Sequence, residues 1–316
     1  MSESCSGNCQ SCGGSCSDPA LKVRNALAGV EHKIVVMSGK GGVGKSTVAV
    51  NLALALALDG RRVGLLDVDV HGPSVPAMLG IKDAHLETTP EGRIRPVEAA
   101  GLKVVSVGFL LDAPDTPVIW RGPVKIGVIQ QFLSDVDWDG IDTLVVDCPP
   151  GTGDEPLSVC QLLLDADGAV VVTTPQRVAA LDVAKSVKFC EQVGFPVLGL
   201  VENMAGFACP HCGEVTRIFP GEAGAELAAR YGVPLLGSIP IDPLVAAQGD
   251  AGLPFIRKDE TSPTTRAFLA VVGRLGLDAG GSAGGIRRRR PHGLNSAPVS
   301  AILPRHDIFP KGTTTP

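Results

Sequence analysis

The sequence predicts an α/β fold in which a mostly parallel central sheet carries helices on both faces. Short apolar, β-branched segments alternate with helical patterns at the spacing of βαβ units. Hydrophobic residues make up 44% of the 316 residues and aromatic residues only 4%, so the core must come from Val, Leu, Ile and Ala. That composition suits strands buried on both faces of a sheet. Right-handed crossovers then place helices on both sides.

The elements follow one another in a regular alternation. An apolar run at 34–38 predicts the first strand, a Gly-rich loop follows, and a helix is expected over 45–58. The other expected strands are residues 62–70, 102–107, 143–147, 169–174, 197–202 and 235–239. The other expected helices are residues 124–133, 178–193, 222–231 and 264–275. These elements define one expected domain over 30–275.

The two ends of the chain differ in composition from this domain. Residues 1–20 are rich in Ser, Gly and Cys and cannot pack a core alone, so we expect a cysteine-rich segment ordered by a metal. Residues 276–316 begin with a Gly/Ala/Ser linker, continue with a basic run and contain several prolines. This composition predicts a disordered tail.

Charge and hydropathy exclude some functions. The formal net charge of -5 argues against a general nucleic-acid binder. The sequence has no apolar run of the length that a membrane helix needs, and its N-terminus has no apolar signal region. We therefore expect a cytoplasmic protein without a membrane partner.

A phosphate-binding loop follows the first expected strand. Residues 39–46 fit the pattern G-x-x-x-x-G-K-S/T at every fixed position, and the motif opens the expected helix. Glycines let backbone N–H groups converge on phosphate oxygens, and the helix N-terminus favours negative charge. Lys45 is expected to reach the β- and γ-phosphates, and the Ser46 hydroxyl is expected to bind Mg²⁺. The expected nucleotide-binding residues are Gly39, Gly41, Gly42, Gly44, Lys45, Ser46 and Thr47.

Acidic residues follow two other strands. Asp147 ends the strand at 143–147, where we expect it to hold a water on Mg²⁺. Asp67 and Asp69 end the strand that begins at residue 62. Parallel strands bring their carboxyl ends to the edge that carries the P-loop. We expect Asp69 to orient the attacking water at the γ-phosphate, the alternative being that either residue only caps a turn.

Six of the nine cysteines form two clusters that point to metal. Cys209 and Cys212 have the tight-turn spacing in which both sulfurs face one metal, but two thiolates do not complete a tetrahedral site. Two chains across a two-fold axis supply four thiolates, which suits a bridging [4Fe-4S] cluster. From spacing alone zinc is an equal alternative, and a redox dithiol is a further one.

The N-terminal cluster has the spacing C-x₃-C-x₂-C-x₃-C, close to that of bacterial ferredoxins. Four thiolates in so short a segment could hold one cluster, with zinc, a redox role or an empty segment as alternatives. The candidate ligands are Cys5, Cys9, Cys12 and Cys16. The other three cysteines, Cys148, Cys160 and Cys190, lie in expected strands or helices and are expected to be buried.

Several longer motifs resemble one family. Residues 40–45 resemble the deviant Walker A motif of the MinD, ParA and nitrogenase-iron-protein class. Residues 67–74, 120–123, 147–154 and 202–204 resemble the Mrp/ApbC family of P-loop iron–sulfur cluster carriers. The resemblance extends from about residue 30 to residue 275.

This resemblance implies further roles. ATP is the implied nucleotide, hydrolysed in a homodimer that bridges a [4Fe-4S] cluster and delivers it to apo iron–sulfur proteins. Lys40 is implied to reach the nucleotide of the partner chain. Asn203, with the loop around Pro240 and Asp242, is implied to contact adenine, and the segment after Asp147 to report nucleotide state. The resemblance also favours an iron–sulfur cluster over zinc at Cys209 and Cys212.

Three other functions are compatible with parts of the sequence. A positioning ATPase of the MinD/ParA kind needs a membrane helix or a basic DNA-binding face and has no use for Cys209 and Cys212. An ATP-dependent iron–sulfur reductase has its cysteines at different places in its sequence. A zinc-stabilised ATPase is the third alternative.

Overall fold

The computed structural model describes residues 18–111, 120–219, 223–256 and 262–277. All of them belong to one compact unit that reaches Gly280. The expected tail from residue 278 and the four N-terminal cysteines lie outside the described residues.

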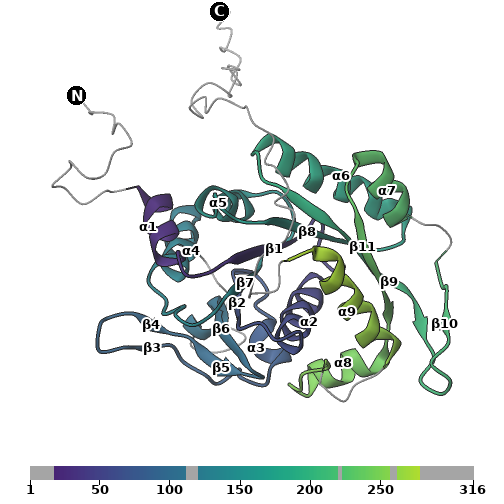
Figure 1. Ribbon diagram of the computed structural model, residues 1–316, viewed down its shortest axis with the longest axis horizontal. Helices are drawn as coiled ribbons and strands as arrows, with labels where there is room; N and C mark the ends of the chain where they lie inside the picture. The colour runs from purple at the N-terminus through teal and green to yellow at the C-terminus, as the bar shows by residue number, and fades with distance from the viewer. Residues whose placement is uncertain (1–17, 112–119, 220–222, 257–261, 278–316) are drawn as a thin grey trace, which may run out of the picture. The chain divides into compact units, whose positions relative to one another are not determined.

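Nine strands of the described residues form one sheet, in the order β10-β9-β8-β1-β7-β2-β6-β5, with β11 paired to β9 (Figure 1). Neighbouring strands are parallel except for β5–β6 and β9–β10, so the mostly parallel sheet is confirmed. The strands are β1 (His32–Ser38), β2 (Val63–Asp67), β5 (Val97–Ala99), β6 (Leu102–Ser106), β7 (Thr143–Asp147), β8 (Gly168–Thr173), β9 (Val197–Ala208), β10 (Val215–Thr216) and β11 (Leu235–Ile241). A separate hairpin pairs β3 (Glu87–Thr88) with β4 (Ile94–Arg95).

Helices cover both faces of the sheet, as the sequence predicts (Figure 1). One face packs against α2 and α9, and the other against α1, α4, α5, α6 and α7. The helices are α1 (Pro19–Ala26), α2 (Lys45–Leu58), α3 (Val75–Met78), α4 (Gly122–Ser134), α5 (Asp154–Leu162), α6 (Arg177–Gln192), α7 (Ala223–Tyr231), α8 (Pro243–Asp250) and α9 (Pro263–Leu275). None of the described helices is long and apolar enough to cross a membrane.

Strand β1 shows how the sheet divides two hydrophobic cores. Ile34 and Val36 belong to the core under α2 and α9, whereas Val35 and Met37 belong to the core on the opposite face. Successive side chains of a strand point to opposite faces, so a continuous apolar run fills both cores. Full burial of such a side chain stabilises the fold by about 1.5–3 kcal/mol. The buried strands therefore fix their carboxyl ends in place.

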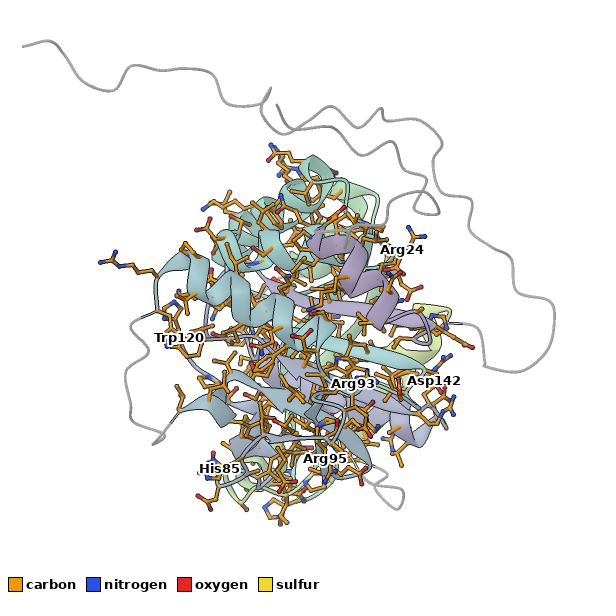
Figure 2. The ribbon with its side chains drawn as sticks, turned by 90° about the vertical axis from the view of Figure 1, so that its left-hand side faces the viewer. Arg24, His85, Arg93, Arg95, Trp120 and Asp142 are labelled. Atoms are coloured by element: carbon orange, nitrogen blue, oxygen red, sulfur yellow. The ribbon has the colours of Figure 1, made fainter. Side chains whose placement is uncertain are left out.

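The side of the molecule shown in Figure 2 carries charged side chains, among them Arg24, Arg93 and Asp142. Lys22 of α1 lies 2.7 Å from Asp135 at the end of α4. Arg93 lies 3.0 Å from both Asp137 and Asp139. Exposed pairs of this kind contribute only about 0–1 kcal/mol each. This side therefore has ordinary surface ion pairs that hold neighbouring segments together.

The structure differs from the sequence prediction mainly in short elements. Strand β2 ends at Asp67, so the expected strand to residue 70 is three residues too long, and β9 continues to Ala208, six residues past the expected end at 202. The sequence pattern did not reveal α1, α3, α5, α8 or the short strands β3, β4, β5 and β10. These elements have too few residues for a hydrophobic period to emerge, and several begin at a proline in the first helical turn.

Candidate functional site

The P-loop joins β1 to α2. Gly44 precedes the helix with a φ of 77°, in the left-handed region that glycine adopts most easily. A Cβ atom at Gly44 would overlap the side-chain nitrogen of Asn203, and one at Gly39 would overlap the backbone of Asp182 in α6. Glycine is therefore required at both positions by close approach of the neighbouring elements.

Lys45, the first residue of α2, points into a group of carboxylates. Its Nζ donates to Asp147 Oδ1 at 2.6 Å and to Ser46 Oγ at 3.0 Å, and lies 3.5 Å from Asp69 Oδ2. Burial disfavours the charged amine, but the ion pair and hydrogen bond to Asp147, helped by Asp69 and Asp67, outweigh it and raise the pKa of Lys45. The ammonium is thus held ready for negatively charged ligands.

Asp67 and Asp147 pair in register at the carboxyl ends of β2 and β7, and both are fully buried. Asp67 accepts hydrogen bonds from the Asp69 backbone N–H at 3.0 Å and from Ser106 Oγ at 2.9 Å. Burial, together with the negative charge of Asp147, raises the pKa of Asp67 to about 8.

Asp147 has one oxygen in use and one available. Burial raises the pKa of its carboxyl, while the nearby Lys45 opposes that shift. Its Oδ2 is buried, and no group in the described part of the chain donates a hydrogen bond to it. An orphaned buried oxygen of this kind fits a water bound to a metal ion.

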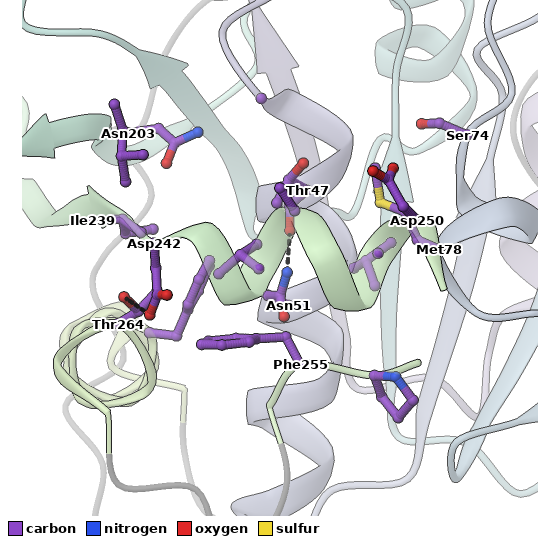
Figure 3. A pocket seen from close by; sticks show the side chains of 18 of the residues that line it. Thr47, Asn51, Ser74, Met78, Asn203, Ile239, Asp242, Asp250, Phe255 and Thr264 are labelled. Atoms are coloured by element: carbon purple, nitrogen blue, oxygen red, sulfur yellow. Dashed lines mark hydrogen bonds between the residues drawn. The ribbon is translucent and has the colours of Figure 1, made fainter. Parts of the chain in front are cut away.

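Two adjoining cavities lie around the P-loop. The smaller, of about 220 Å³, is lined by Ser38, Lys40, Gly41, Gly42, Gly44, Lys45, Ser46, Thr47, Asp69, Ser74, Met78 and Pro150. The larger, of about 470 Å³, shares Gly44, Thr47, Ser74 and Met78 with it and continues between α2 and α8 (Figure 3). A charged cavity beside a larger, more apolar one matches the phosphates and the base of a nucleotide.

The larger cavity contains the residues that the family resemblance assigned to adenine. Asn203 from β9 lines it and donates from Nδ2 to the Val43 carbonyl at 2.9 Å. Asp242, before α8, lines it as well and accepts from Thr264 Oγ1 at 2.9 Å (Figure 3). No sequence motif points to Thr264, because it lies at the start of α9, far along the chain from the motifs.

Lys40 lies at the rim of the smaller cavity. Its backbone carbonyl accepts a hydrogen bond from Ser38 Oγ at 2.9 Å, which fixes the start of the loop. Within the described ranges its ammonium makes no ion pair with a carboxylate. The side chain is therefore available to a charged group from outside the chain.

A second charged cluster, which sequence reasoning missed, lies beside the phosphate cavity. Lys125 Nζ of α4 lies 2.8 Å from His71 Nε2 and donates to Glu155 Oε1 of α5 at 2.8 Å. Lys125 lowers the pKa of Glu155 against the effect of partial burial. The cluster ties the loop after Asp69 to the start of α5.

Cys209 and Cys212 lie in the turn that connects β9 to β10. The Cys209 backbone N–H donates to the Glu214 carbonyl at 2.9 Å, and the Gly213 N–H donates to the Cys209 carbonyl at 2.8 Å. The backbone N–H groups of Cys212 and His211 lower the pKa of Cys209. Cys212 is exposed. The turn thus places two thiols, one of them with increased thiolate character, at an exposed site.

Among the described residues, Cys209 and Cys212 have no further ligands that would complete a metal site. In the described ranges, no three histidine, cysteine or acidic side chains come close enough together to hold a metal ion. Cys148, Cys160 and Cys190 are buried, as expected, and burial raises the pKa of Cys160 to about 12 and that of Cys190 to about 11.

The fold and this site together define a nucleotide-binding protein of the P-loop NTPase class. Residues 29–276 match the family described as ParA: NUBPL iron-transfer P-loop NTPase, and the chain belongs to that family.

Relatives and a solved structure agree with this assignment. The chain is 46% identical over 280 residues to the iron-sulfur cluster carrier protein of Methanocaldococcus jannaschii, covering 86% of this chain and 96% of the relative. It is 48% identical to the cytosolic Fe-S cluster assembly factor NUBP2 homolog of Monosiga brevicollis, covering 80% and 90%. A nucleotide-binding protein from Archaeoglobus fulgidus, solved in complex with ADP and with Co, is 40% identical with a TM-score of 0.67, covering 79% and 96%.

Proposed function

We propose that this chain is an ATP-dependent carrier that binds a [4Fe-4S] cluster and transfers it to apo-proteins. One observation carries the proposal: a chain with a nucleotide site also presents an exposed cysteine pair that is incomplete without further ligands. An exposed, shared cluster site suits a cargo that must leave again. The names of the curated relatives support the same cargo.

The nucleotide half of the proposal assigns roles to the residues around the P-loop. Lys45 exchanges its ion pair with Asp147 for the β- and γ-phosphates of ATP. Ser46 Oγ and a water on Asp147 Oδ2 hold Mg²⁺, which supplies positive charge to the phosphates. Asp69, 3.5 Å from Lys45, orients the attacking water, and slow hydrolysis coupled to cluster binding or transfer is part of the proposal.

The cargo half requires two chains. Cys209 and Cys212 of each chain supply two thiolates, so a homodimer supplies the four that a bridging cluster needs. Lys40, which has no carboxylate partner in the described residues, extends to the nucleotide of the partner chain. The N-terminal cysteines Cys5, Cys9, Cys12 and Cys16 form a second cluster site in residues 1–20. A cytoplasmic location is part of the proposal and rests on the cytosolic relative.

Iron and acid-labile sulfide per chain, measured after anaerobic reconstitution, test the cargo. The wild type is compared with the Cys209→Ser/Cys212→Ser double variant. A bridging cluster contributes about two irons per chain, so the double variant is expected to lose about two irons and two sulfides and keep those on the N-terminal cysteines. The matched control is Cys160→Ala/Cys190→Ala, which removes two buried thiols and should leave the iron content unchanged.

Zinc without sulfide in the wild type would refute the carrier and leave an ATPase with a structural metal. Equal iron loss in both double variants would refute the assignment of Cys209 and Cys212 as ligands. Sedimentation of the cluster-containing wild type should show a dimer, and the fraction of dimer should be lower for the Cys209→Ser/Cys212→Ser variant.

A further inference from the structure

Strand β9 connects the larger cavity, where we place the nucleotide base, to the turn that carries Cys209 and Cys212. Strand β9 carries Asn203 into the larger cavity and continues to Ala208, directly before Cys209. Asn203 also bonds the P-loop itself, through the Val43 carbonyl at 2.9 Å. A base in the cavity, or a shift of the P-loop, therefore acts on β9 only a few residues before the thiols.

Glu202 connects the two ends of the segment that carries the cysteines, and we call its contacts the Glu202 clamp. Glu202, buried at 8% exposure, accepts the Gly224 backbone N–H at 2.9 Å and Ser238 Oγ at 3.4 Å. Gly224 lies in the first turn of α7, where the chain returns from the β9–β10 hairpin. The hairpin thus starts and ends at one fixed point, and its orientation depends on the backbone just after Glu202.

Met204 follows this point in an unusual conformation. Its φ is 59°, and among the residues that the structure describes only Ala100 shares a positive φ without being glycine. The pairing of β9 with β11 also shifts here, because Asn203 pairs with Ile239 and Phe207 with Ile241. Between these two pairs β9 advances by four residues and β11 by only two, so β9 contains a bulge. Bulges redirect a strand and concentrate near functional sites.

The Met204 side chain reaches back to the phosphate loop. Its Cε lies 3.7 Å from the position that a Cβ atom would occupy on Gly44, and Met204 lines the base cavity beside Asn203. Beyond the bulge, β9 pairs with β10 through Val215–Ala208 and Thr216–Phe207, and with β11 through Phe207–Ile241. Met204 therefore lies between the larger cavity and the strand pairs that lead to the cysteine turn.

We propose that Met204 is a positioning residue through which base occupancy in the nucleotide cavity sets the geometry of the Cys209–Cys212 turn. The inference rests on the proposed function, because it takes the base site and the cargo site from it. The left-handed backbone at Met204 is costly for a side chain other than glycine, so contacts on both sides must hold it. A base that contacts Asn203 and Met204 changes those contacts, and the hairpin turns with them.

The test measures the reactivity of the two thiols in the full, reduced, cluster-free chain. The alkylation rate of the peptide containing Cys209 and Cys212 is followed by mass spectrometry with iodoacetamide, with and without saturating ADP. We expect ADP to change the wild-type rate by about fivefold, the lower end of typical couplings between two sites. In Met204→Gly, which releases the backbone, the ADP effect should fall below about twofold at an ADP concentration that calorimetry shows to saturate this variant.

Ala100→Gly is the matched control, since it replaces the other positive-φ residue, at the turn before β6, and should keep the full ADP effect. The peptide with buried Cys160 reports folding in every sample, because it reacts slowly in a folded chain. If Met204→Gly exposes Cys160, Met204→Ala replaces it, removing the contact with the P-loop and reducing the ADP effect in the same way.

Two outcomes overturn the inference. Either the alkylation rate of the wild-type thiols does not change with ADP, or the Met204 variants keep the full ADP effect on that rate. Neither outcome bears on cluster binding, because the alkylation uses no iron. Conversely, a chain that binds no cluster but shows the Met204-dependent effect would refute the proposed cargo and leave this coupling intact.

Discussion

Replacing Asp67 with Asn tests the electrostatics of the carboxylates around Lys45. The pKa of Asp67 is raised from 3.8 to about 8, so between these values the folded chain holds a proton that the unfolded chain has lost. Asp67 therefore favours the folded state only at low pH, and the stability of the wild type falls as pH rises toward 8. One such proton makes the stability fall by roughly 1 kcal/mol per pH unit, on the order of 2–3 kcal/mol between pH 5 and pH 7.

Asp67→Asn has no proton to hold and keeps the hydrogen bonds. Its amide oxygen accepts the Asp69 N–H, and its amide nitrogen donates to Ser106 Oγ, whose hydroxyl can rotate. Relative to the wild type, the free energy of unfolding of the variant should therefore rise by roughly 2–3 kcal/mol from pH 5 to pH 7.

Urea unfolding of the nucleotide-free chain in EDTA, at half-unit steps between pH 5 and pH 8, measures this difference. Asp83→Asn, at an exposed carboxylate, is the control and should give a flat difference. If the free energy of unfolding of Asp67→Asn differs from that of the wild type by the same amount at every pH, the argument that Asp67 has a raised pKa in the folded chain is refuted.

Three further predictions concern the cavity walls and the buried thiols. Gly44→Ala should weaken ADP binding by roughly tenfold or more, because a left-handed alanine costs about 1–2 kcal/mol and its Cβ overlaps Asn203; calorimetry that finds unchanged affinity contradicts this. Cys190→Ser should cost about 1–3 kcal/mol in thermal unfolding while leaving the iron content intact, and iron loss in a folded variant would instead make it a ligand. Thr264→Val leaves a buried oxygen of Asp242 unpaired and should cost about 1–3 kcal/mol in urea unfolding and weaken ADP, whereas a neutral change would show that the bond is dispensable.

The parts of the fold and site that the sequence could predict are contiguous in the chain. The P-loop at 39–46 is one uninterrupted motif, and β1 before it is a short, continuous apolar run rich in β-branched residues, which fits a strand buried on both faces. Asp67 and Asp147 could be placed at one edge because parallel strands share the direction of their carboxyl ends. Their positions therefore followed from topology before any coordinates.

The parts that the sequence could not predict depend on contacts between distant segments. Thr264 supports Asp242 across 22 residues, and Lys125 meets Glu155 across 30, with no local pattern at either end. The neutral state of Asp67 needs the complete burial that only the assembled sheet provides. The bulge at Met204 appears only when β9 and β11 pair, since a strand pattern does not reveal where register shifts.

The clamp at Glu202 has a consequence for how this chain could diversify. Because Glu202 joins the two ends of the segment between residues 203 and 223, the ATPase core is insulated from the length of what lies between them. Closing a loop costs only about 0.6 kcal/mol more for each doubling of its length. Insertions or deletions in the turn between β9 and β10, beyond the cavity residues Asn203 and Met204, could therefore be accepted without unfolding the nucleotide site, which makes this turn a natural place for new cargo specificities.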